Sequence, residues 1–126
     1  MEIETIEQDG LVYVFACEVT GLKNKSSLAF NISLPGRSGY DGFLVRADDG
    51  KLYAYVNSCP HTGAPLNWTP DQFLTASGHY IQCSIHGAKF QVKDGECFVG
   101  PCAGRFLKAL RVVEKDGSSY VAVMDI

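Results

Sequence analysis

Short runs of apolar and aromatic residues recur along the chain, separated by polar residues, Gly and Pro. Runs of this length and spacing are typical of β-strands, and no long amphipathic helix pattern interrupts them. The pattern therefore predicts an all-β fold of several small antiparallel sheets in a single domain, residues 1–126. The predicted strands lie in LVYVFACEV (11–19), SLAFNISL (27–34), GFLVRA (42–47), LYAYVN (52–57), HYIQC (79–83), AKFQV (88–92), ECFVG (96–100), FLKALRVVEK (106–115) and SYVAVMDI (119–126).

Turn residues mark where these strands reverse. Asp-Gly pairs at 49–50, 94–95 and 116–117 predict hairpins, because glycine adopts the positive φ that such turns need. PGRSGYDG (35–42) predicts a turn-rich connection, and TPDQFLTAS (69–77) predicts a short helical turn with Thr69 as its cap and Pro70 at its first position.

Composition adds few constraints. The chain has 126 residues, of which 46% are hydrophobic and 20% charged, as in ordinary globular domains. No apolar run is long enough to span a bilayer, and the acidic start MEIETIEQDG is unlike a signal peptide, so we expect a cytoplasmic protein. The net charge is −3, and five acids without a base fall in residues 1–20. No basic run predicts nucleic-acid binding.

Four residues in two segments carry the candidate chemistry. SCPHTGAPL (58–66) contains Cys59 and His61, and QCSIHGAKF (82–90) contains Cys83 and His86. Two thiolates and two imidazoles are a ligand set for zinc or for an iron–sulfur centre. Common zinc fingers pair Cys with Cys and His with His, whereas each segment here is mixed. A mixed pair suits a binuclear cluster in which one iron takes both Cys and the other both His.

The two segments resemble the ligand loops of the Rieske family, in the C-x-H and C-x-x-H-G motifs and in Gly63, Pro65, Phe90 and Gly100-Pro101. The resemblance covers roughly residues 27–123 and implies one Rieske-type [2Fe–2S] cluster. It also implies a cluster-binding subdomain at about 57–102, with two loops at one tip. By this likeness Cys59 and Cys83 would hold the inner iron, and His61 and His86 the outer iron. Gly100-Pro101 would be the loop that covers the cluster.

Other Cys and His residues match no ligand position. His79 is interpreted as an exposed residue before a strand, and Cys17 as a small buried strand residue. Some Rieske proteins join the two ligand loops by a disulfide, but Ala64 and Ile85 stand at those positions here. Three Cys remain besides the two candidate ligands, and an odd remainder in a cytoplasmic chain favours reduced thiols; a disulfide between Cys97 and Cys102, which flank FVGP, is the alternative.

Residues near the cluster bear on its potential. Leu66, Pro65 and Phe90 are expected to wall it from water, and Trp68 to pack in the core. High-potential Rieske proteins place hydroxyl donors where Ala88 and Phe90 stand here, and neither side chain can donate. We therefore expect a potential at the low end of the Rieske range, about −150 mV.

The resemblance implies a carrier of single electrons, with no catalytic residues, between a flavin-dependent reductase and a terminal oxygenase. A separate oxygenase subunit is disfavoured, because only His79 remains for a second iron site. The alternatives are a small Rieske subunit of a nitrite-reductase-like complex and a zinc-bound interaction module. A [2Fe–2S] protein is brown-red, and a zinc protein is colourless.

Overall fold

The computed structural model describes residues 5–8, 10–34, 37–60, 63–67, 71–84 and 87–122, without the side chains of residues 33, 34 and 37–40. These ranges form strands, turns and bridges, and no helix long and apolar enough to cross a membrane occurs in them. The all-β prediction is confirmed. His61, Trp68 and His86 lie outside the described residues, as do Thr69, Pro70 and Ile85.

Eleven strands form three sheets in the described part of the chain, with antiparallel pairing throughout. The first sheet has the order β1-β2-β11-β10, with bounds Thr5–Gln8, Leu11–Glu18, Ser118–Ala122 and Val112–Lys115. The second has the order β3-β4-β5-β9, with bounds Ser26–Leu34, Arg37–Arg46, Leu52–Val56 and Ala109–Leu110. The third has the order β6-β7-β8, with bounds Tyr80–Gln82, Lys89–Gln91 and Cys97–Val99.

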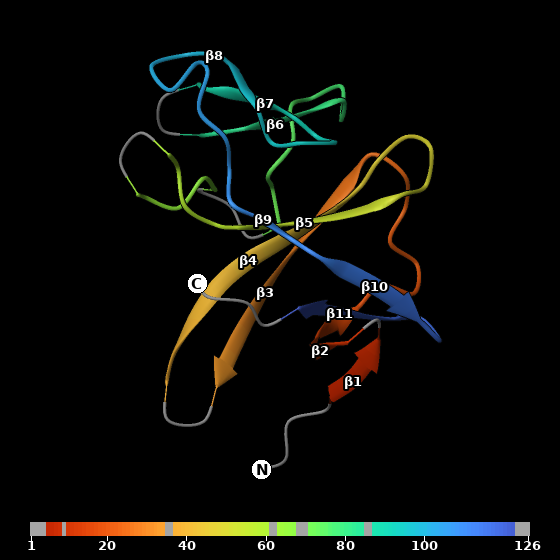
Figure 1. Cartoon of the computed structure of the whole chain (residues 1–126). Helices are drawn as coiled ribbons and strands as arrows, with labels where there is room; N and C mark the ends of the chain where they lie inside the picture. Colours follow the sequence, from red (N-terminus) through yellow and green to blue (C-terminus); the bar gives the residue numbers. More distant parts are fainter. Residues whose placement is uncertain are drawn as a thin grey trace.

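The second sheet lies between the other two, with the three-stranded sheet at one end of the molecule (Figure 1). The second sheet contributes side chains to two cores, because successive side chains along β4 point to opposite faces of the sheet. Phe43 and Val45 face the core on the side of the third sheet, and Leu44 faces the core on the side of the first sheet. All three side chains are fully buried, which accounts for the unbroken apolar run in this strand.

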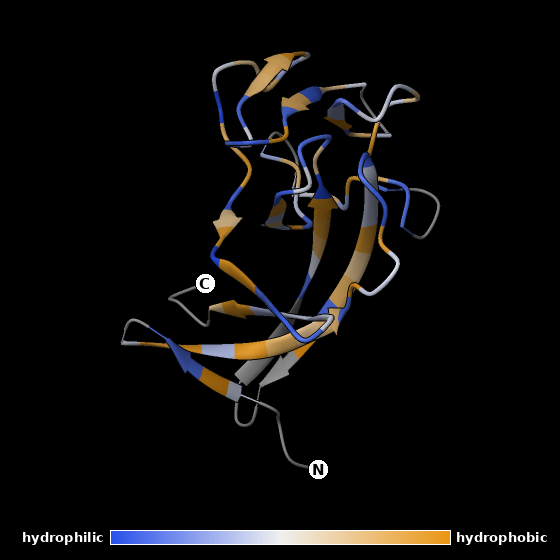
Figure 2. Ribbon diagram, turned by 90° about the vertical axis from the view of Figure 1, so that its right-hand side faces the viewer, coloured by the Kyte–Doolittle hydropathy of each residue, from blue (hydrophilic) through white to orange (hydrophobic). Residues whose placement is uncertain are grey.

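We call the first of these cores the tip core, because it contains both candidate ligand cysteines. Its buried members are Phe43, Val45, Tyr55, Cys59, Leu66, Phe73, Ile81, Cys83, Ala88, Phe90, Cys97, Cys102 and Leu107. The second, the base core, has the buried members Val14, Val19, Phe30, Ile32, Leu44, Ala54, Leu110 and Val121. Figure 2 shows long hydrophobic stretches in the strands that border the base core.

Three predictions about local structure need correction. The run 106–115 is not one strand, because β9 pairs with β5 in the second sheet and β10 pairs with β11 in the first. The segment 37–42 belongs to β4 rather than to a turn. Gly42, the last residue of the predicted turn and the first of the predicted strand 42–47, lies within β4, and the ring of Phe30 lies directly over it, in space that a side chain would fill.

The third correction concerns the expected helical turn at 69–77. Residues 71–77 form no helix in the structure; instead Leu74 makes a β-bridge with Ile81. Phe73 is buried and stacks on Phe43, with ring centroids 4.3 Å apart. Burial of this aromatic side chain in the tip core overrides the local helical preference. Strand β1 was also not predicted, because TIEQ carries little apolar pattern.

Candidate metal centre

The first candidate ligand loop begins at Cys59, just after β5. The Cys59 side chain is buried, and its backbone N–H donates to the carbonyl of Ala64 at 2.8 Å. The N–H of Gly63 donates back to the carbonyl of Cys59 at 2.7 Å. Gly63 has φ 78, a left-handed conformation that costs glycine nothing. The chain therefore turns sharply enough to bring Gly63 and Ala64 back into hydrogen-bonding contact with Cys59.

The second loop repeats this construction. Cys83 follows β6 and is fully buried, and its N–H donates to the carbonyl of Ala88 at 2.8 Å. The N–H of Gly87 donates to the carbonyl of Cys83 at 2.9 Å, and Gly87 has φ 68. In both loops the backbone of the cysteine is thus hydrogen-bonded to the fourth and the fifth residue after it. Two matched loops of this kind can present equivalent thiols to one centre.

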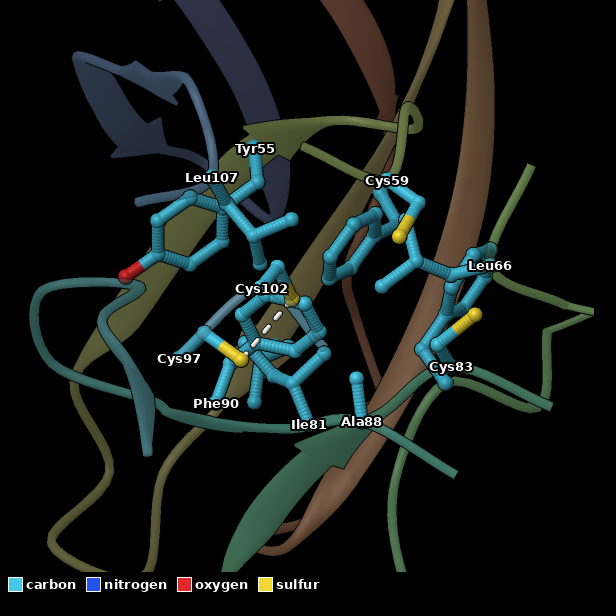
Figure 3. Close-up of a cluster of buried hydrophobic side chains, with 13 residues drawn as sticks. Tyr55, Cys59, Leu66, Ile81, Cys83, Ala88, Phe90, Cys97, Cys102 and Leu107 are labelled. Atoms are coloured by element: carbon cyan, nitrogen blue, oxygen red, sulfur yellow. Dashed lines mark hydrogen bonds between the residues drawn. The ribbon is translucent and has the colours of Figure 1, made fainter. Parts of the chain in front are cut away.

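A direct hydrogen bond joins the two loops. The N–H of Ser84 donates to the carbonyl of Leu66 at 2.8 Å. Cys59, Leu66 and Cys83 belong to the same buried cluster of side chains (Figure 3). Both thiols therefore lie in one apolar environment, although 24 positions separate them in the sequence.

The side chain of Asn57 holds the base of the first loop. Its Oδ1 accepts the N–H of Leu66 at 2.8 Å, and its Nδ2 donates to Oδ1 of Asn67 at 2.9 Å. The sequence interpretation missed this residue. An Asn at the junction of a strand and a ligand loop is the available signal, because its amide can satisfy backbone groups that the strand leaves open.

A third segment covers the second loop. An ideal Cβ on Gly100 would lie 2.9 Å from Cα and 3.0 Å from Cβ of Ala88, so the two backbones touch here. Arg105, at the end of the same segment, donates from Nη1 to the carbonyl of Pro60 in the first loop at 3.3 Å. The segment 97–105 therefore contacts both candidate ligand loops.

Two of the three residues expected to shield the cluster from water are buried in the tip core. Leu66 and Phe90 are fully buried, whereas Pro65 is exposed and contributes nothing to the core. Tyr55 is buried and donates its hydroxyl hydrogen to the carbonyl of Val92. Burial, reinforced by the negative charge of Asp94, raises the pKa of Tyr55 well above its usual range. The phenol therefore stays neutral.

Ala88 and Phe90 are buried in the tip core, as the prediction of a donor-poor site requires. His79 is exposed before β6, in agreement with the sequence interpretation. Cys17 is only half-buried, contrary to expectation, and its Sγ lies 3.6 Å from Oγ of Ser119 in the first sheet. Its burial, though partial, raises the pKa of the Cys17 thiol.

Comparison with known proteins agrees with this geometry. The family model of the Rieske [2Fe-2S] domain matches residues 13–122. The chain belongs to the Rieske [2Fe-2S] domain family. The family resemblance that the sequence predicts is thus confirmed, and with it the cofactor, one Rieske-type [2Fe–2S] cluster. No match was found among curated proteins.

Solved structures share the Rieske fold over most of this chain. The ferredoxin of carbazole 1,9a-dioxygenase from Nocardioides aromaticivorans IC177 is 24% identical, with a TM-score of 0.64 over 87% of this chain and 96% of that chain. The Sphingomonas yanoikuyae B1 ferredoxin is 21% identical, with a TM-score of 0.66 over 89% and 99%. The terminal oxygenase of carbazole 1,9a-dioxygenase from Novosphingobium sp. KA1 is 23% identical, with a TM-score of 0.67 over 90% of this chain but 30% of that chain.

The residues described here fit a Rieske cluster. Thiolates are the ligands that iron–sulfur clusters take, and this chain offers two buried thiols at equivalent places in two joined loops. Among the described residues no three side chains of Cys, His, Asp or Glu gather into a metal site on their own. The two remaining predicted ligands, His61 and His86, fall outside these residues, so the four-ligand assignment stays a prediction.

Proposed function

We propose that this chain is a cytoplasmic one-electron carrier that passes electrons from a flavin-dependent reductase to a terminal oxygenase. Cys59, His61, Cys83 and His86 hold one [2Fe–2S] cluster in a subdomain of about residues 57–102. The observation that carries the proposal is the pair of matched loops, each starting from a buried cysteine and joined by the bond from Ser84 to Leu66. No residue is assigned a catalytic role.

The roles of the chain's own residues follow from their contacts. The cluster, when bound, accepts and gives up one electron. Leu66 and Phe90 exclude water from the inner thiols, since both are fully buried beside them. The Gly100 segment covers the second loop, and Asn57 holds the base of the first. Rigid loops suit a carrier, because little of the site needs to rearrange as charge changes.

Exposed apolar side chains on the third sheet support contact with a partner protein. Tyr80 and Phe98 pack together at 5.0 Å between ring centroids, and Val99, the next residue of β8, is 41% exposed. Aromatic side chains are enriched at protein interfaces. Val12 offers a matched control, because it is 47% exposed on β2 in the first sheet, away from the tip core.

Metal analysis tests the cluster. Freshly purified protein should contain two irons and two acid-labile sulfides per chain, be brown-red, and give the low average g-value typical of Cys/His ligation when reduced. Cys83→Ser and His86→Ala should lose the cluster, while the controls Cys17→Ser and His79→Ala should keep it. Stoichiometric zinc in a colourless protein would instead support the interaction module.

Electron transfer tests the carrier role. The probe is a reduced flavin reductase of a ring-hydroxylating dioxygenase system, and the measurement is its rate of electron transfer to the chain. We expect Val99→Asp to slow transfer several-fold and Val12→Asp to leave it unchanged. Equal rates in wild type and both variants would show that the reductase does not bind at the third sheet. Stable co-purification with a larger reductase would favour the subunit alternative.

A further inference from the structure

Two cysteines that no ligand prediction uses lie against each other in the tip core. Cys97 is 1% exposed and Cys102 is 0% exposed. The Sγ of Cys102 donates to the Sγ of Cys97 at 2.8 Å, drawn as the dashed line in Figure 3. All five cysteines of the chain are free thiols in this structure. A disulfide S–S bond is about 2.05 Å long, so these sulfurs need to approach by less than about 1 Å to bond.

The backbone brings the two thiols together. The N–H of Cys97 donates to the carbonyl of Arg105 at 2.8 Å, and the N–H of Gly104 donates to the carbonyl of Cys97 at 2.9 Å. These bonds close the neck of the segment 97–105, in which residues 98–101, including Phe98 and Val99 of β8, are exposed. The Cys97 thiol donates in turn to the carbonyl of Val99 at 3.3 Å. The neck therefore holds both sulfur atoms in a fixed relation beneath a solvent-facing loop.

We propose that Cys97 and Cys102 form a reversible disulfide across the neck of the covering loop. The oxidant is a low-molecular-weight disulfide. One cysteine thiolate attacks it to give a mixed disulfide, and the second cysteine then displaces the remaining small thiol. Overall two S–H bonds break and one S–S bond forms in the chain. The small disulfide takes up the two electrons and two protons and leaves as two thiols.

Burial makes this reaction conditional on opening of the loop. Burial, followed by the hydrogen bond with Cys97, raises the pKa of Cys102 to about 12. The attacking species is the thiolate, which is scarce while the neck is closed. Opening the exposed segment 98–101 admits water and the oxidant together. The two thiols therefore react slowly while the neck is closed. They are oxidised by the surrounding small disulfide only when the segment opens.

The position of the neck implies that the disulfide would affect retention of the cluster. Gly100, between the two cysteines, touches Ala88 in the second ligand loop. A cross-link at the neck limits how far this segment can lift from the loop, because it removes open conformations. Oxidised protein should therefore lose its cluster more slowly. This consequence rests on the proposed function, whereas the disulfide itself does not.

The tryptic peptide 94–105 allows a direct test, because it contains Cys97 and Cys102 and no other cysteine. Holoprotein is incubated with oxidised glutathione, alkylated, digested and analysed by mass spectrometry. The wild-type peptide should lose two hydrogens and escape alkylation, and dithiothreitol should reverse this. Cys17, in another tryptic peptide, is the internal control and should not pair with either cysteine. A peptide alkylated at both positions, or linked to a second chain, would overturn the proposal.

Two variants extend the test. Cys97→Ser and Cys102→Ser each leave one thiol, so each should carry glutathione as a mixed disulfide instead of losing two hydrogens. Cluster loss is followed as decay of visible absorbance with a chelator. It should be several-fold slower in oxidised than in reduced wild type, whereas oxidation should give no such slowing in Cys102→Ser. Equal decay in oxidised and reduced wild type would overturn the protective effect. A protein without visible absorbance whose peptide still loses two hydrogens would contradict only the proposed function.

Discussion

Replacing Gly100 by alanine tests whether the covering loop must touch the second ligand loop. Gly100 has φ 106, and a Cβ there would lie 2.9 Å from Cα of Ala88. Real Cβ atoms essentially never approach that closely, so one of the two segments must shift. The obstacle is backbone and a methyl group rather than the end of a flexible side chain. Gly100→Ala should therefore separate the covering loop from the ligand loop.

Two contributions make up the expected loss of stability. A left-handed conformation costs an alanine about 1–2 kcal/mol. Crowding in a well-packed site costs about 1–3 kcal/mol more. Gly104 separates the two, because it has φ 90 but an added Cβ meets no atom within 4 Å. Gly104→Ala should thus show the backbone contribution alone, and the difference of about 1–3 kcal/mol between the variants measures the contact with Ala88.

Urea unfolding followed by circular dichroism measures the difference. With an m-value of about 2 kcal/mol per M, the midpoint of Gly100→Ala should lie about 0.5–1.5 M below that of Gly104→Ala. Cluster loss in a chelator should also be faster in Gly100→Ala than in Gly104→Ala. Coinciding midpoints and equal rates in the two variants would refute the reasoning, because the close approach would then carry no energy.

Three further predictions concern the surroundings of the site. Asn57→Ala removes the side chain that holds the base of the first loop, and should lower the free energy of unfolding by about 1–3 kcal/mol and speed cluster loss. The control Asn24→Ala loses only an exposed hydrogen bond to the 47–51 turn and should change neither quantity. Ala88→Ser with Phe90→Tyr supplies donors at buried positions and should raise the potential by several tens of mV, measured by protein-film voltammetry, where a tenfold change in equilibrium is about 59 mV; an unchanged potential would contradict the donor argument. The pKa of Tyr55 is raised by burial, so the unfolded chain releases this proton near pH 10 while the folded chain retains it. Stability should therefore be intact below about pH 10 and fall as the pH rises further, and Tyr55→Phe should fall less steeply across that window.

Local chemistry in the sequence predicted much of the fold. Alternating apolar residues and Asp-Gly pairs are sufficient for strands and hairpins, because both depend on neighbours a few residues apart. The prediction was wrong where distant contacts decide. Phe73 is drawn into the tip core against a local helical preference, and β4 extends back to Arg37 by pairing with β3. Neither contact follows from the residues of the segment itself.

The sequence by itself determined the candidate chemistry of this protein: the types and spacing of the predicted ligands and the absence of hydroxyl donors at Ala88 and Phe90 follow from residue identity. Only the tertiary structure decided which segments meet. It joins the two ligand loops through Ser84 and Leu66, and it pairs the thiols of Cys97 and Cys102. The physical reason is that contacts between distant segments depend on how the sheets pack, whereas the donor atoms of a side chain are set by its own covalent structure.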